Sequence, residues 1–194
     1  MGEKVILYTR QHENSLYELK NKGIITNKEI YVRLHMMDIA PYFLDKYGIF
    51  IEMAEKIVPR PEGSDYPIWC SISKRNCLKP IVNEVVYEIE VPNEEIIYFD
   101  GSKWDYVLNN LYIPKDEEDK NNYKKELEQL GVSDEYNFIE GKYKGQYPDI
   151  EKKIIDSWDR IFDIDTWSDF IVQANIWRIK EEWVMRILRP GDPI

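Results

Sequence analysis

The segment of residues 84–91 alternates strictly between two kinds of side chain. One set is apolar and the other is mainly acidic: Val85, Tyr87, Ile89 and Val91 against Glu84, Val86, Glu88 and Glu90. A period of two places the two sets on opposite faces of an extended chain, which is typical of a β-strand with one buried face. The chain must therefore form a sheet, and other elements must cover its apolar face.

Further strands are expected before and after this one. Runs of β-branched and aromatic residues predict strands over residues 5–9, 67–73 and 95–99, the last as a short partner or a continuation of the strand at 84–91. The segment 171–189 fits either a helix or two antiparallel strands with a turn near residues 180–182. Its β-branched and aromatic content favours the strands.

Helices are expected between the strands. Asn14 can cap the first helix, and Gly23 provides its C′ position, where glycine adopts the left-handed backbone without steric cost. The inward face of this helix is predicted to carry Leu16, Tyr17 and Leu19. Apolar stripes with helical spacing predict further helices over residues 41–57, 102–111 and 148–162.

The composition changes over residues 114–147, which are charged, rich in tyrosine and poor in core material. We expect this stretch to be a helical insertion or lid, with a surface helix over residues 116–130 that ends at Gly131. The whole chain, residues 1–194, is predicted to be a single α+β domain with a mainly antiparallel sheet flanked by helices. Glycine-rich phosphate-binding motifs of the G-x-G-x-x-G and G-x-x-x-x-G-K types are absent.

The charge balance limits the partners of the chain. Its 194 residues include 26 Lys and Arg against 36 Asp and Glu, a formal net charge of −10, which opposes broad binding to duplex DNA. The acidic side chains are concentrated in residues 84–100, which contain no Lys or Arg. No apolar run approaches the roughly 20 residues that span a membrane, and the N-terminus lacks a signal-peptide core, so we expect a cytoplasmic protein.

Cys70 and Cys77 are the only cysteines, and their number and spacing do not suggest a disulfide framework. We expect one buried thiol and one loop thiol. With only His12 and His35 as histidines, the spacing matches no zinc motif, and no metal is expected.

A set of short motifs spread over nearly the whole chain resembles a bacterial family called domain of unknown function 3841. The motifs are Thr9-x-Gln11, Pro92 followed by Asp100, Trp104, Val107-Leu108-Asn109, Ser157-Trp158, Ile161-Phe162-Asp163, Gln173-Ala174 and Trp177. The resemblance implies a single domain of prokaryotic or phage origin, and it implies no reaction.

A second resemblance concerns the order of motifs. Tyr8-Thr9-Arg10, a helix ending near Gly23, Ser71-Ile72-Ser73 and Glu88-Ile89-Glu90 follow one another in an order similar to that of ADP-ribosyltransferases. This resemblance implies a related fold and NAD as the bound cofactor. It implies that Arg10 binds the pyrophosphate of NAD and that Ser71 supports the ribose or the arginine. It also implies that Glu90 hydrogen-bonds a ribose hydroxyl and stabilises the positive charge that develops as nicotinamide leaves.

Four further side chains are candidates for contacts with the cofactor. Gln11 and Gln173 place amides next to β-type residues, where an amide can make fixed hydrogen bonds in a cleft. Tyr66 and Trp69 could stack on a nicotinamide or a base.

Three functions remain open at this point. The first is ADP-ribosyl transfer from NAD to an unknown protein or nucleic-acid acceptor. The second is a non-enzymatic acidic protein that binds and modulates a protein partner, as in toxin–antitoxin or phage–host defence systems, through the acidic segment 84–100. The third is binding of a small ligand or single-stranded nucleic acid by the basic, Trp-containing strands at the C-terminal end.

Overall fold

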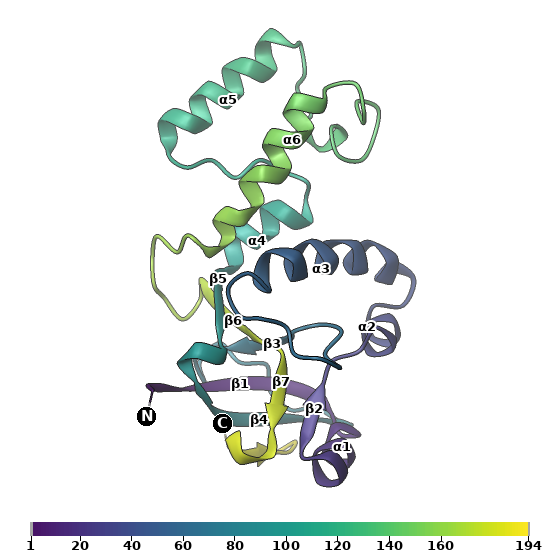
Figure 1. Cartoon of the computed structure of the whole chain (residues 1–194), viewed down its shortest axis with the longest axis vertical. Helices are drawn as coiled ribbons and strands as arrows, with labels where there is room; N and C mark the ends of the chain where they lie inside the picture. The colour runs from purple at the N-terminus through teal and green to yellow at the C-terminus, as the bar shows by residue number, and fades with distance from the viewer. Residues whose placement is uncertain (1, 194) are drawn as a thin grey trace. The chain divides into compact units, whose positions relative to one another are not determined.

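The computed structural model describes residues 2–193 and has an α+β fold with a mainly antiparallel sheet, as predicted (Figure 1). The main sheet has six strands in the order β5-β6-β3-β1-β4-β8. Its strands are β1 (Lys4–His12), β3 (Ile68–Ser71), β4 (Glu84–Pro92), β5 (Ile97–Asp100), β6 (Val172–Ile176) and β8 (Val184–Leu188). The pairings of β1 with β3 and β4, of β3 with β6, and of β4 with β8 are all antiparallel.

Contacts within the chain define two compact units. The first, here called the sheet unit, comprises the chain up to Phe99 and from Thr166 onward, and the second, the helical unit, is Asp100–Asp165. The predicted insertion at 114–147 lies inside the helical unit, whose bounds are wider. Its role as a lid stays a prediction.

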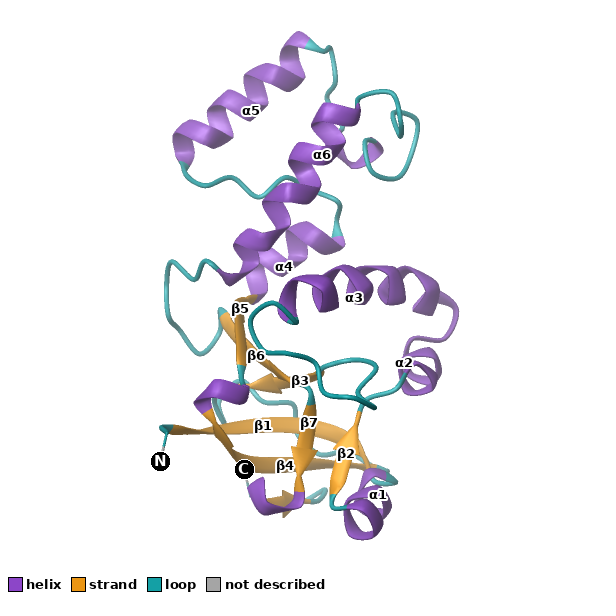
Figure 2. Cartoon of the chain, viewed as in Figure 1, coloured by secondary structure: helices purple, strands orange, loops and turns teal. Residues whose placement is uncertain are grey.

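The sheet unit also contains a small second sheet and three helices. The small sheet pairs β2 (Ile24–Thr26) with β7 (Arg178–Lys180). The helices are α1 (Ser15–Lys22), α2 (Glu29–Met36) and α3 (Ala40–Ala54), coloured in Figure 2. The sequence predicted α1 and α3, but neither β2 nor α2.

One face of the main sheet carries the principal core. Leu7, Tyr87 and Ile89 from β1 and β4 are fully buried there, together with Ile25 and Ile179 of the small sheet. The small sheet therefore covers this face of the main sheet. The packing removes the apolar side chains of both sheets from water.

The opposite face is covered in two places. Near α3, Trp69 packs against Phe50, with ring centroids 5.3 Å apart. Near β8, Tyr8, Val86 and Leu188 form a small second cluster. The strand β4 is thus covered on both faces, and the expectation of a single buried face is wrong for Val86 and Glu88, which are both buried.

The C-terminal segment consists of strands, as favoured, but these strands do not pair with one another. The strand β6 pairs with β3, β7 with β2, and β8 with β4. In the same way, β5 lies beside β6 at one edge of the sheet and does not pair with β4. The side-chain pattern of a strand shows which face is buried, but it does not identify the strand's partner.

The first helix ends as predicted, with Gly23 in the left-handed conformation at a φ of 69°. Two details of the prediction are wrong. Asn14 makes no side-chain capping bond, because its backbone is already helical. Tyr17 is 75% exposed, while Leu19, two residues away and hence on the other side of the helix, is buried.

The helical unit contains α4 (Gly101–Leu108), α5 (Glu117–Gln129) and α6 (Pro148–Ser157). The carboxylate of Asp100 caps α4 by accepting hydrogen bonds from the N–H groups of Ser102 and Lys103, at 2.8 and 3.1 Å. The helix α5 is followed by Gly131 at a φ of 68°, which confirms the predicted end.

Short 3₁₀ segments connect several elements. They are Met37–Ile39, Asn93–Glu95, Glu135–Asn137, Trp158–Phe162 and Glu181–Trp183. Within residues 2–193, no helix combines the length and the apolar character needed to cross a membrane.

Candidate functional site

A straight row of polar side chains crosses five strands of the main sheet on the face opposite the principal core. Strand register places its members directly opposite one another, in the order Gln173, Ser71, Tyr8, Glu88 and Arg186. Opposite residues of an antiparallel pair project to the same face, so these five side chains share one face. We call this set the polar row.

Glu88 is the buried carboxylate of the polar row, with a side chain that is only 8% exposed. Two cations face it: the ammonium of Lys74 at 3.7 Å and the guanidinium of Arg186 at 3.5 Å. Burial raises the pKa of the neighbouring Tyr8 hydroxyl, and the charge of Glu88 raises it further. The Tyr8 hydroxyl is therefore neutral at neutral pH.

A cavity of about 560 Å³ lies beside the cations that face Glu88. It is formed by the loop between β3 and β4 and by the segment after β8, and its lining residues are Lys74, Arg75, Cys77, Lys79, Pro80, Gly191, Asp192 and Pro193. We call it the basic cavity, because three of these side chains are cationic and one is acidic. Arg186 links the row to the cavity through a hydrogen bond to the carbonyl of Pro193, at 3.5 Å.

Arg10 holds the loop that lines the basic cavity. Its Nε lies 2.7 Å from a carboxylate oxygen of Glu84, and its Nη1 donates to the carbonyl oxygen of Lys79 at 3.3 Å. The guanidinium thus binds groups of its own chain, and these contacts indicate that Arg10 positions the loop.

The three residues predicted to carry catalysis share a face of the sheet without meeting at one point. Arg10 lies opposite Val86, and Glu90 lies opposite Ile6. Four residues along β4 separate these two positions, a distance of about 13 Å. Glu90 forms an exposed ion pair with Lys4 at 2.8 Å.

The structure brings together one predicted catalytic residue, Ser71, and one predicted cofactor contact, Gln173. Ser71 and Gln173 are direct neighbours in the polar row, and the Ser71 hydroxyl donates to the carbonyl of Ser73 at 2.9 Å. Gln11 lies on the opposite face, where its amide donates to the Thr9 hydroxyl at 2.8 Å. Thr9 in turn donates to the Trp69 carbonyl at 2.8 Å, so this chain of bonds joins β1 to β3.

The predicted stacking residues belong to an aromatic cluster under α3. Trp69 lies 5.5 Å from Tyr47 and 5.2 Å from Phe99, measured between ring centroids. Tyr66, in the loop before β3, lies 6.3 Å from Tyr47. Neither Tyr66 nor Trp69 lines the basic cavity.

The acidic segment 84–100 is largely neutralised by cations. Four of its glutamates form ion pairs: Glu84 with Arg10, Glu88 with Lys74 and Arg186, Glu90 with Lys4, and Glu95 with Lys180. The same carboxylates therefore do not form the exposed anionic face that the sequence suggested.

The two thiols differ as predicted, because Cys70 is buried and Cys77 is partly exposed in the loop. Burial raises the pKa of Cys70 to about 12 and also raises the pKa of Cys77, which lines the basic cavity. Over residues 2–193, no three His, Cys, Asp or Glu side chains are arranged to hold a metal ion.

The sequence analysis identified Ser71 and Gln173 but missed the other three members of the polar row. Tyr8, Glu88 and Arg186 were not proposed as members, and the basic loop was not noticed. A signal existed for the loop, since Lys74, Arg75 and Lys79 lie within six residues between two predicted strands.

Comparisons with known proteins agree with one of the two resemblances. No curated protein and no solved structure matches the chain. The sequence model of the family described as Domain of unknown function (DUF3841) matches residues 6–185. Because this match covers nearly the whole sequence, the chain belongs to the DUF3841 family.

Proposed function

We propose that this protein transfers ADP-ribose from NAD to a protein or nucleic-acid acceptor in a bacterial or phage-infected cell, with Glu88 as the essential carboxylate. The observation that carries the proposal is a buried carboxylate in a row of hydroxyl, amide and cationic side chains, directly beside a basic cavity. The order of the sequence motifs supports the same reaction.

The basic cavity suits the pyrophosphate of NAD. Lys74, Arg75 and Lys79 provide three positive charges, of which Lys74 also faces Glu88 at 3.7 Å, and Asp192 is the acidic residue of the lining. Asp192 is engaged by the backbone N–H of Arg189 at 2.7 Å. The volume of about 560 Å³ lies within the range of roughly 300–1,000 Å³ that is usual for small-molecule sites.

Glu88 has the surroundings that the reaction requires of its acid. As the bond between the ribose C1′ and nicotinamide breaks, nicotinamide keeps the electron pair and positive charge develops on the ribose. A carboxylate that accepts a hydrogen bond from a ribose hydroxyl stabilises this charge. The acceptor then forms a bond to C1′ and loses a proton. At 3.5 and 3.7 Å, the cations hold Glu88 loosely enough for a ribose hydroxyl to compete.

Nicotinamide release with NAD as the substrate tests this assignment. We expect E88Q to lower the rate by about 100-fold or more, since lost transition-state charge stabilisation costs 10²–10³ in other enzymes. The matched control is E94Q, which changes an exposed glutamate outside the polar row. If E90Q abolishes the activity and E88Q does not, the assignment from sequence replaces ours. If wild type neither binds NAD in calorimetry nor releases nicotinamide, the proposal is wrong.

A second candidate, binding of a protein partner, is favoured by a different observation. Ile30, Leu34 and Met37 follow one another at helical spacing along α2 and its end, and all three are exposed. An exposed apolar stripe of this kind is typical of interaction surfaces. If this function is correct, L34D should prevent recovery of the partner from lysate, while I155D, at an exposed position of α6, should not.

The third candidate function, binding of a small ligand or single-stranded nucleic acid by the C-terminal strands, loses its main support. Trp177 and Trp183 are buried, so they provide no stacking surface for bases. Lys180 pairs with Glu95 at 3.0 Å, which removes part of the positive charge of these strands.

A further inference from the structure

The helical unit contains a cavity of its own, with a volume of about 410 Å³. It lies between the start of α5 and the α6 helix, and its lining residues are Tyr112, Lys115, Asp119, Asp149, Lys152, Lys153, Asp156 and Arg160. Four of these side chains are cationic and three are acidic. The proposed transfer activity uses none of them.

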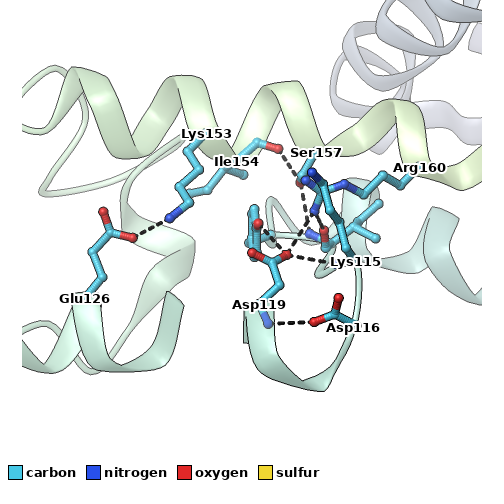
Figure 3. Close-up of polar contacts among 10 residues, drawn as sticks. Lys115, Asp116, Asp119, Glu126, Lys153, Ile154, Ser157 and Arg160 are labelled. Atoms are coloured by element: carbon cyan, nitrogen blue, oxygen red, sulfur yellow. Dashed lines mark hydrogen bonds and ion pairs between the residues drawn. The ribbon is translucent and has the colours of Figure 1, made fainter. Parts of the chain in front are cut away.

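Arg160 is the fixed cation of this cavity. Its guanidinium donates to the carbonyl oxygen of Ile113 and also to Asp119 at 3.4 Å. Its carbon Cζ lies 5.2 Å from the centre of the Tyr112 ring, within the range of a cation–π contact. Figure 3 shows the side chains of Arg160 and Asp119 pointing toward each other from two different segments of the helical unit. An arginine held in this way loses little further entropy when it binds an anion.

Asp119 does not make the cavity a cation site, because three donors already surround one of its oxygen atoms. One oxygen accepts hydrogen bonds from the Tyr112 hydroxyl at 2.7 Å and from the backbone N–H of Lys115 at 2.8 Å, as well as from Arg160. Burial alone raises the pKa of Asp119, but these donors outweigh it and lower the pKa. The charge of this carboxylate therefore stabilises its contacts with Tyr112, Lys115 and Arg160.

The remaining lysines are available to a ligand to different degrees. Lys153 is engaged with Glu126 at 2.6 Å. Lys152 forms an ion pair with Asp156, but both side chains are exposed, at 72% and 61%, and such pairs contribute little to stability. Lys115 forms no ion pair with any residue between 2 and 193.

We infer that this cavity binds a phosphate monoester, with the phosphate held between Arg160, Lys115 and Lys152. Two flexible ammonium groups and one fixed guanidinium can donate charge-assisted hydrogen bonds to the oxygen atoms of a phosphate dianion, which would replace the exposed pairing of Lys152 with Asp156. The cavity is larger than a phosphate group, and the edge of Tyr112 provides an apolar surface for the organic part of the ester. The inference does not depend on the proposed transfer of ADP-ribose.

The test uses the full chain with K74Q and K79Q, which weaken the basic cavity of the sheet unit so that this second site can be titrated alone. Ribose 5-phosphate and inorganic phosphate are the probes, at low ionic strength, in calorimetry. We expect saturable binding of both, with ribose 5-phosphate the tighter ligand. Adding K115Q and K152Q should weaken binding about tenfold, which corresponds to about 1.4 kcal/mol for the two lost charges together.

The matched control adds K120Q instead, which removes a lysine of α5 that pairs with Glu117 outside the cavity. It should change the affinity less than twofold. Far-UV circular dichroism checks that each variant folds. The inference is overturned if no probe saturates, if only inorganic phosphate binds, or if K115Q and K152Q bind ribose 5-phosphate as tightly as their parent. None of these results bears on nicotinamide release by wild type, so the two proposals can fail separately.

Discussion

Glu88 on β4 lies directly opposite Arg186 on β8, with the closest oxygen and nitrogen atoms 3.5 Å apart. The carboxylate is almost completely buried, while the guanidinium is 46% exposed. A buried charge is costly unless a partner compensates it, and Lys74 is the other cation within 4 Å among the described residues. The pair therefore joins the edge strand β8 to its neighbour β4 through one partly hydrated contact.

Removal of this partner should be measurable in the stability of the protein. We expect R186A to lower the free energy of unfolding by about 1–2 kcal/mol, less than for a fully buried pair because Lys74 remains and water reaches Arg186. Urea denaturation at neutral pH measures the change. K4A, which breaks the exposed pair with Glu90, is the control and should cost about 0.5 kcal/mol or less. Equal losses in the two variants would contradict this account of Glu88.

Arg10 should control the order of the loop that lines the basic cavity. In R10A the carbonyl of Lys79 loses its donor and Glu84 loses its cation, so the amides of residues 76–82 should exchange with solvent about tenfold faster or more. Hydrogen exchange with mass spectrometry measures this rate. R33A removes an arginine that pairs with Glu29 on the surface of α2, and it should leave the loop unchanged. Unchanged exchange in R10A would exclude the positioning role.

Ser157 should be important for the stability of the helical unit. Its hydroxyl accepts a hydrogen bond from the N–H of Ile113 at 2.9 Å and donates to the carbonyl of Ile154 at 2.6 Å, in a fully buried position. S157A leaves that N–H without a partner, which should cost about 1–3 kcal/mol. Thermal and urea unfolding measure the loss. S133A, at an exposed serine of the same unit, is the control, and a similar effect of both changes would argue against the buried bond.

The two cysteines should react at different rates. The pKa of Cys70 is raised to about 12 by burial, so almost none of it is thiolate at pH 8, and the pKa of Cys77 is also raised. A colorimetric thiol reagent should therefore label Cys77 slowly and leave Cys70 unlabelled until urea unfolds the chain. In C77S the native protein should show no reactive thiol. Rapid labelling of C77S in native buffer would show that Cys70 is accessible.

Asp119 should stabilise the protein at neutral pH and lose this effect in acid. Its pKa in the folded state lies below the usual 3.8, so the folded protein binds fewer protons than the unfolded chain as the pH falls through 3.8. The contribution is complete above that value and is lost as the pH drops through the lowered pKa. The difference in unfolding free energy between wild type and D119N should therefore be larger at pH 7 than at pH 3. A difference that does not change with pH would contradict the lowered pKa.

Local patterns were sufficient to predict the strongly periodic elements. The strand at 84–91, the helix over residues 41–57 and the helix that ends at Gly23 all depend on residues close together in the sequence. The strand β2 was missed because it has three residues and pairs with β7, more than 150 positions later. A strand this short carries too few side chains for a period to be visible.

The choice between Glu88 and Glu90 shows why the site could not be predicted in the same way. Both glutamates belong to the polar set of the same strand, and the alternation treats them as equivalent. The loop that carries Lys74 and Cys77, together with β8, covers Glu88, and neither contact can be read from the strand itself. The prediction of Glu90 relied on motif order alone, which carries no information about depth in the sheet.

The helical unit is a single continuous segment that begins where β5 ends and returns to the chain just before β6, and these two strands are neighbours in the main sheet. The helical unit is thus inserted between two strands that are hydrogen-bonded neighbours. Excision of residues 101–165 would leave the end of β5 to be joined by a short linker to the segment that leads into its neighbour β6. We therefore expect the helical segment to be removable as a module, which expression of the shortened chain would test.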